Sequence, residues 1–179
     1  MGARLVLPHL GGAGPEGRVG VSAVFSPDRL YRYELEREVN ALGEGTVTFG
    51  MLNGSKANEN SNDPTVTRTI GFALGWGFRF LRVVNIFALV STDPRELYRH
   101  SEPIGGENDH FIAKAIVETS QFIAAWGVHG ALMDRGPQVL RMLLGMAPVR
   151  VAHLGLTKDG HPRHPLYLPK TVERQRFDS

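Results

Sequence analysis

The chain contains no cysteine among its 179 residues. That absence excludes disulfide bonds, thiolate metal sites and cysteine nucleophiles. Long hydrophobic runs are also missing, since no apolar stretch approaches the roughly 18–20 residues that a membrane-spanning helix needs. The N-terminal stretch MGARLVLPHLGG is too short and too broken for a secretory signal. We therefore expect a cytoplasmic protein that has no membrane partner.

Several catalytic signatures are absent as well. The sequence lacks H-E-x-x-H, the Walker phosphate loop and G-x-S-x-G. The GGAG stretch at residues 11–14 neither follows a predicted strand nor opens a predicted helix, so it is not a dinucleotide fingerprint. The seven histidines are scattered without metal-ligand spacing. We expect no metal site, no cofactor and no obligatory protein partner.

A strong charge of one sign is missing too. Lys and Arg number 20 against 18 Asp and Glu, which gives a formal net charge of +2 and a sequence pI of about 9.1. The hydrophobic share of 42% is ordinary for a globular protein. The mild basicity is compatible with a phosphate-bearing partner.

The chain divides into three parts by composition. Residues 1–20 are rich in glycine and have no sustained periodicity, which predicts a flexible N-terminal arm. Residues 21–170 carry the periodic apolar segments and form a single predicted α/β domain. Residues 171–179 remain as a C-terminal tail.

Within residues 21–170, strand patterns precede and then alternate with helix patterns. The first two strands, 21–25 and 29–38, are expected to form a hairpin. Further strands are predicted at 46–52, 80–90, 121–127 and 149–156. One helix is predicted to begin at Pro64, after the cap Asp63, and another at Pro94, after Thr92 or Asp93. Two more helices are predicted over residues 108–120 and 137–146.

Apolar strands that alternate with helices favour a three-layer α/β/α fold. We therefore predict a mostly parallel central sheet of about four strands, with the N-terminal hairpin added. In such sheets, ligands bind in a crevice outside the carboxyl ends of the strands. The polar residues at those ends are accordingly the candidates for a functional site.

Two asparagines and one or two histidines occupy these predicted positions. Asn53 follows the strand 46–52, Asn85 lies within the apolar strand 80–90, and His161 and His164 follow the last strand. A buried amide must satisfy both its donor and its acceptor or lose roughly 1–3 kcal/mol for each unpaired group. Two amides and an imidazole at one edge would suit a planar heterocycle.

The order of these elements resembles the uracil-DNA glycosylase superfamily. GMLNGS (50–55) is similar to its first motif, RVVNIFA (82–88) to its base-reading strand, AAWGVHG (124–130) to its Leu-Trp-Gly element and HPRHPLYL (161–168) to its His-Pro loop. Across residues 29–168 the chain more closely resembles a bacterial and phage family known only as domain of unknown function 1643. That family usually has proline where this chain has Gly54.

The resemblance implies a nucleobase N-glycosidase that acts on a damaged or modified base in DNA. Asn53 would position the attacking water, Asn85 would read the base edge, and His164 would stabilise the departing base. Either His161 or His164 fits the His-Pro motif, and we prefer His164 because Leu166 follows its proline. Phe72 or Phe87 would stack on the base.

The remaining candidates carry competing interpretations. Asp63 is predicted as the helix cap, and alternatively as a catalytic carboxylate that activates water or grips a sugar hydroxyl. Arg68 is a helix-surface residue or a phosphate ligand. Lys158 and Arg163 are expected to contact nucleic acid, and Leu166 or Tyr167 would fill the gap that an extruded base leaves. Two other functions stay open, namely hydrolysis of free nucleotides or nucleosides and non-catalytic binding of a nucleotide or nucleic acid.

Overall fold

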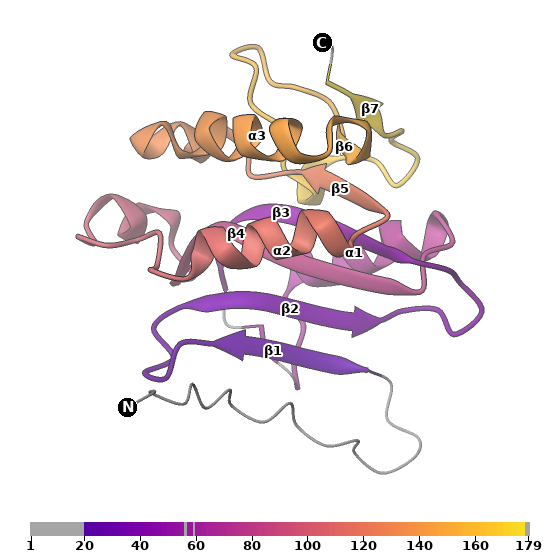
Figure 1. Ribbon diagram of the computed structural model, residues 1–179, viewed down its shortest axis with the longest axis horizontal. Coiled ribbons are helices and arrows are strands. Elements are labelled where there is room, and N and C mark those ends of the chain that lie inside the picture. The colour runs from indigo at the N-terminus through magenta and orange to yellow at the C-terminus, as the bar shows by residue number, and fades with distance from the viewer. Residues whose placement is uncertain (1–19, 56, 59, 178–179) are drawn as a thin grey trace, which may run out of the picture.

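The computed structural model describes residues 20–55, 57–58 and 60–177 (Figure 1). The predicted N-terminal arm, residues 1–20, lies outside the described residues except for Gly20. None of the helices in the described part combines the length and apolar character that crossing a bilayer requires.

Seven strands, three α-helices and several 3-10 segments make up the described residues. The strands are β1 (Val21–Phe25), β2 (Arg32–Glu38), β3 (Thr46–Gly54), β4 (Phe80–Val90), β5 (Gln121–Ala124), β6 (Val151–His153) and β7 (Gln175–Arg176). The helices are α1 (Pro64–Gly75), α2 (Asn108–Glu118) and α3 (Arg135–Met146). The 3-10 segments are η1 (Pro94–Tyr98), η2 (Val128–Asp134), η3 (Pro148–Arg150) and η4 (Pro165–Tyr167).

The described strands form one mixed sheet in the order β1-β2-β4-β3-β5-β6-β7. The pairings β3 with β4, β3 with β5 and β5 with β6 are parallel, whereas β1 with β2, β2 with β4 and β6 with β7 are antiparallel. The predicted α/β class is confirmed. The four central strands β4, β3, β5 and β6 are parallel, as predicted. The whole sheet is larger and mixed, because the N-terminal hairpin and β7 join it through antiparallel pairings.

Strand β4 is almost entirely buried. It pairs with β2 on one side, where Leu35 lies opposite Val83. On the other side it pairs with β3, where Thr46 lies opposite Phe80. Nine of its eleven residues are buried, which explains why residues 80–90 read as a nearly continuous apolar run. Asn85 stands in the middle of this strand.

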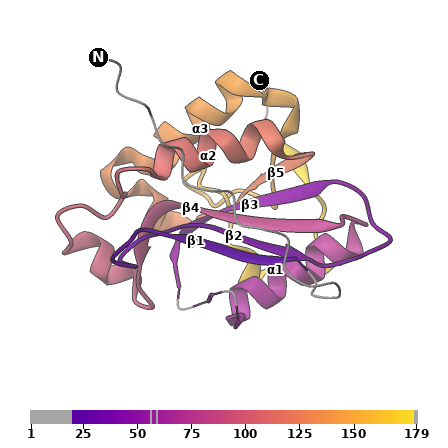
Figure 2. The same ribbon diagram turned by 60° about the horizontal axis from the view of Figure 1, so that its bottom comes forward.

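Helices cover both faces of the sheet. Figure 2 shows α1 on one face and α2 and α3 on the other. One core cluster joins Val66 and Phe72 of α1 to the sheet, and a second joins Ile112 of α2 and Leu143 of α3 to its opposite face. Helix α1 begins as predicted, because the Asp63 carboxylate accepts a hydrogen bond from the Val66 N–H at 2.7 Å.

Several segments differ from the sequence prediction. Strand β5 ends at Ala124 rather than at residue 127. Residues 94–98 form a 3-10 turn capped by Asp93 rather than the start of an α-helix. Strand β6 is limited to 151–153, within the predicted 149–156. The predicted C-terminal tail contains β7, which pairs with β6, and Val172 and Phe177 pack against the two core clusters. Tertiary contacts therefore order residues whose local sequence has no strand pattern.

Candidate functional site

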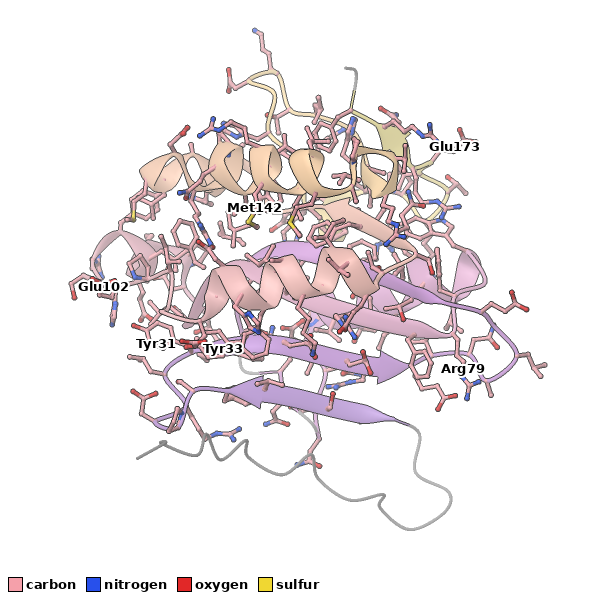
Figure 3. All side chains as sticks on the ribbon, in the orientation of Figure 1. Tyr31, Tyr33, Arg79, Glu102, Met142 and Glu173 are labelled. Carbon is pink, nitrogen blue, oxygen red and sulfur yellow. The ribbon has the colours of Figure 1, made fainter. Side chains whose placement is uncertain are left out.

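A cavity of about 710 Å³ opens at the carboxyl ends of β3 and β4. Strand order reverses here, since the chain passes from β3 to β4 on one side and then returns to β5 on the other. Such switch points are where ligands bind in open α/β sheets. In Figure 3 this end of the sheet is the one near Tyr31 and Glu102, opposite Arg79.

This strand-end cavity gathers most of the side chains singled out from the sequence. Segments far apart in the chain supply them: the end of β3, the start of α1, the centre of β4 and the loop after β6. The predicted residues that line it are Asn53, Asp63, Asn85, Arg163, His164, Leu166 and Tyr167. The two amides and the imidazole thus face one space.

Asn85 is buried without a hydrogen-bond partner for its side chain. It is only 1% exposed, and neither Nδ2 nor Oδ1 bonds to any described residue. Apolar Met51 and Val83 line the cavity with it. Unpaired buried polar atoms are costly, so an amide with a free donor and a free acceptor is prepared for a ligand that offers both.

The backbone that carries Asn85 is held by side chains. Strand β2 pairs with β4 only as far as Val83, and beyond it Asn108 Nδ2 donates to the carbonyl oxygens of Asn85 (2.8 Å) and Ile86 (3.1 Å). Arg135 Nε, also buried, donates to the Ile86 carbonyl at 2.8 Å. These donors replace missing sheet hydrogen bonds and fix the strand without using the Asn85 side chain.

Asn53 is oriented by its amide nitrogen. Nδ2 donates to the carbonyl oxygens of Ser91 (2.7 Å) and Gly54 (3.1 Å). The side-chain oxygen bonds to no described residue and remains an acceptor. An oxygen fixed in this way is able to accept from, and so orient, a water molecule.

The surroundings of His164 favour its neutral imidazole form. Its Nδ1 accepts a hydrogen bond from the Leu166 N–H at 3.3 Å, which leaves the proton on Nε2. Burial lowers the pKa of His164 below its usual value, and the Asp63 carboxylate works against that shift. Nε2–H is therefore a neutral donor at the cavity wall near pH 7.

The loop that carries His164 is tied to the sheet and to α1. The Gly127 N–H donates to the Pro162 carbonyl at 2.8 Å. Arg68 donates through Nε to the Pro165 carbonyl at 3.4 Å and through Nη2 to the Leu168 carbonyl. Arg68, predicted as a surface residue or phosphate ligand, therefore positions this loop, and it does not line the strand-end cavity.

Asp63 combines its capping role with a place in the cavity. One carboxylate oxygen caps α1, and the other accepts from the Ser55 hydroxyl. The Asp63 carboxylate is also close enough to His164 to influence its titration. The capping interpretation of Asp63 is confirmed. Its catalytic role stays a prediction, with which its position in the cavity is consistent.

Four other candidates lie away from this cavity. Phe72 is buried in an aromatic cluster with Phe49 and Trp76, and Phe87 is fully buried in the core on the α2 side. Alternation along β4 breaks after Ile86, so that Phe87 follows Ile86 into the same cluster. Neither ring lines the strand-end cavity, so neither is placed to stack on a base bound in it. Lys158 is exposed and does not line the cavity. His161 does not line it either, which favours His164 as the motif histidine.

Sequence reasoning missed Arg32. It is 2% exposed in the cavity wall, and its Nη1 donates to the carbonyls of Ala57 (2.7 Å) and Ser55 (3.4 Å). Burial lowers the pKa of Arg32 to about 10, with Asp63 opposing the shift. The strand pattern of residues 29–38 offered no signal for it, because a charged residue in an alternating strand is normally assigned to the solvent face.

A metal centre has no ligand set in the described part of the chain. No group of three or more His, Asp or Glu side chains is placed there to hold an ion. The cavity can instead offer a buried amide edge, a neutral imidazole donor and an orienting carbonyl oxygen.

Comparison with known proteins adds a family assignment. The model of a family described as protein of unknown function (DUF1643) matches residues 32–166. No curated protein and no solved structure matches the chain. The matched range begins at Arg32 and includes Asn53, Asn85 and His164.

Proposed function

The chain belongs to the DUF1643 family, and we propose that it is a nucleobase N-glycosidase of the uracil-DNA glycosylase type. The observation that carries this proposal is the convergence of Asn53, Asn85 and His164 on one cavity, with both polar atoms of Asn85 unpaired. The cavity volume of about 710 Å³ lies within the range of small-ligand sites. The sequence resemblance and the geometry support the same chemistry.

The reaction breaks the bond between the sugar C1′ and a base nitrogen. The electron pair leaves with the base, and the oxocarbenium-like sugar accepts a water molecule at C1′. Asn85 would bind the base edge through one donor and one acceptor. His164 Nε2–H would donate to the base oxygen on which negative charge develops, and a neutral donor suits a base that leaves as an anion.

The attacking water would be held by the Asn53 carbonyl oxygen. An amide is too weak a base to ionise water, so the leaving group departs first and the water adds afterwards. The water then loses its proton to solvent, or to Asp63, whose carboxylate lines the same cavity. The departed base anion takes up a proton from solvent, which balances the proton released by the water. The products are the neutral free base and a sugar that carries a hydroxyl at C1′.

The test is base release from oligonucleotides containing uracil, hypoxanthine or modified pyrimidines, followed by alkaline strand scission. Asn53→Ala and His164→Ala should each reduce the rate, and loss of an oxyanion donor typically costs about 10²–10³ in rate. His161→Ala is the matched control, since this neighbouring His-Pro histidine does not line the cavity.

Three outcomes would count against this proposal. Full activity of His164→Ala, or equal losses in the His161 and His164 variants, would remove the assigned role of His164. Release from monomers alone would indicate a hydrolase of free nucleotides or nucleosides. Oligonucleotide binding without any base release, with a steep salt dependence, would indicate a non-catalytic binding module.

A further inference from the structure

A second hollow of about 600 Å³ runs along α1 beside the strand-end cavity. Asp63, Pro64 and Leu166 line both hollows, so the two meet at these residues. We call the second hollow the α1 groove. Beyond the shared residues it is lined by Asn62, Thr67, Arg68, Gly71, Phe72 and Lys170.

The described side chains around the two hollows carry an excess of positive charge. Arg32 and Arg163 line the cavity, Arg68 and Lys170 line the groove, and Asp63 is the one carboxylate among these lining residues. This excess is larger than the net charge of +2 of the entire chain. The positive charge is therefore concentrated here, where it would attract an anionic ligand.

The two cations of the groove are not neutralised by carboxylates. Arg68 donates to the carbonyls of Pro165 and Leu168, which are uncharged acceptors. Lys170 is exposed and forms no ion pair with another described residue. Both oxygens of Asp63 already accept hydrogen bonds, from Ser55 and from the Val66 N–H.

The groove is kept open at a glycine. Gly71 lies inside α1, and a Cβ at this position would meet nothing within 4 Å. Glycine within a helix costs roughly 0.5–1 kcal/mol relative to alanine. The protein itself would tolerate a larger residue here, but that side chain would extend into the groove.

From these observations we infer that the α1 groove binds a phosphate ester adjoining the nucleoside whose base enters the strand-end cavity. The inference rests on the proposed function in that it assumes a nucleobase in the cavity. Arg68 and Lys170 supply the positive charge for the phosphate, and the open surface at Gly71 gives it room. A free nucleotide and a nucleic-acid strand both present this group.

The test uses binding of a fluorescein-labelled thymidine pentanucleotide at low salt. Gly71→Glu should weaken binding about tenfold, the size expected of one like-charge contact partly exposed to water, and Gly71→Gln should have a smaller effect. Gly75→Glu is the matched control, because Gly75 is exposed on the same helix and equally open but does not line the groove. Added salt should reduce the difference between the two glutamate variants.

Equal affinities of Gly71→Glu and Gly75→Glu, or of Gly71→Glu and Gly71→Gln, would overturn the phosphate assignment. Urea unfolding of each variant checks that the comparison is made between folded proteins. Since the assay measures binding, it does not depend on base release. If the protein releases no base but Gly71→Glu weakens binding, the phosphate site stands and the proposed glycosidase function fails. If the protein releases base but Gly71→Glu has no effect on binding, only the phosphate site fails.

Competition then separates the two sources of phosphate. Thymidine, thymidine 5′-monophosphate and unlabelled pentanucleotide are compared on the wild type and on Gly71→Glu. Competition by the monophosphate that is lost in Gly71→Glu assigns the groove to a free nucleotide. Competition by the pentanucleotide alone assigns the groove to a nucleic-acid strand. If Gly71→Glu weakens the binding of thymidine, which has no phosphate, as much as that of the phosphate-bearing competitors, the inference is contradicted.

Discussion

Replacing Asn85 by leucine should make the protein more stable and remove ligand binding. The side chain is 1% exposed, and its two polar atoms lack partners among the described residues. Each buried unpaired group costs about 1–3 kcal/mol, so we expect the free energy of unfolding to rise by at least about 2 kcal/mol. Leucine should pack against the apolar neighbours Met51 and Val83.

Urea denaturation measures this change. The midpoint should increase at an unchanged m-value, and thermal unfolding should shift upward by about 4–8 °C for a chain of this size. Base release or oligonucleotide binding by the same variant should fall to background. Stability and function would then move in opposite directions, as expected of a residue kept for its ligand.

Asn108→Leu is the control for this prediction. Asn108 is equally buried, but its Nδ2 donates to the carbonyls of Asn85 and Ile86. We expect this variant to be no more stable than the wild type, because the Asn85 carbonyl left unpaired offsets the removal of the buried, unpaired Oδ1 of Asn108. An Asn85→Leu protein that unfolds at lower urea than the wild type would refute the reasoning, since the amide would then be held by partners of its own.

Three further predictions concern the walls of the strand-end cavity. Because burial lowers the pKa of His164, the unfolded chain binds the proton more readily than the folded protein does. The free energy of unfolding should therefore decline as pH falls below about 6.5. Urea unfolding should show a weaker pH dependence in His164→Gln, and an unchanged dependence would contradict this prediction. Arg32→Met should weaken ligand binding about tenfold but change the free energy of unfolding by less than about 2 kcal/mol. The loss of its hydrogen bonds to Ser55 and Ala57 is offset because a guanidinium is no longer buried. A larger loss of stability would instead make Arg32 a structural residue. Gly127→Ala should cost about 1–3 kcal/mol in a urea titration, since φ is 72° and ψ is −171° there, a conformation that is essentially limited to glycine. Gly145→Ala in α3, with open space, should be neutral or stabilising.

Much of the local structure could be predicted because its signals lie within short stretches. The Asp63-Pro64 cap starts α1, and residues 80–90 form β4 at the predicted bounds. The N-terminal hairpin also formed as its alternation indicated. The sequence pointed to Asn53 because it follows a predicted strand, and to Asn85 because a buried amide within an apolar strand needs partners.

Other site features could not be predicted, because they depend on pairings between distant segments. Whether an arginine of β2 faces solvent or the cavity depends on which distant segment covers it, and Arg32 is buried against the segment after β3, where it donates to the carbonyls of Ser55 and Ala57. The assignment of Phe87 failed because the alternation of β4 breaks next to it. Arg68 looked like a surface residue because its carbonyl partners lie about a hundred residues further along the chain.

The amino-acid sequence by itself determined the order of strands and helices and the polar residues at strand ends, since apolar periodicity and caps act over a few residues. The tertiary structure decided which of those residues meet, how many strands join the sheet, and that a buried cation and the α1 groove lie beside the amides. Those features arise from strand order and loop packing, which bring together groups that no local pattern connects.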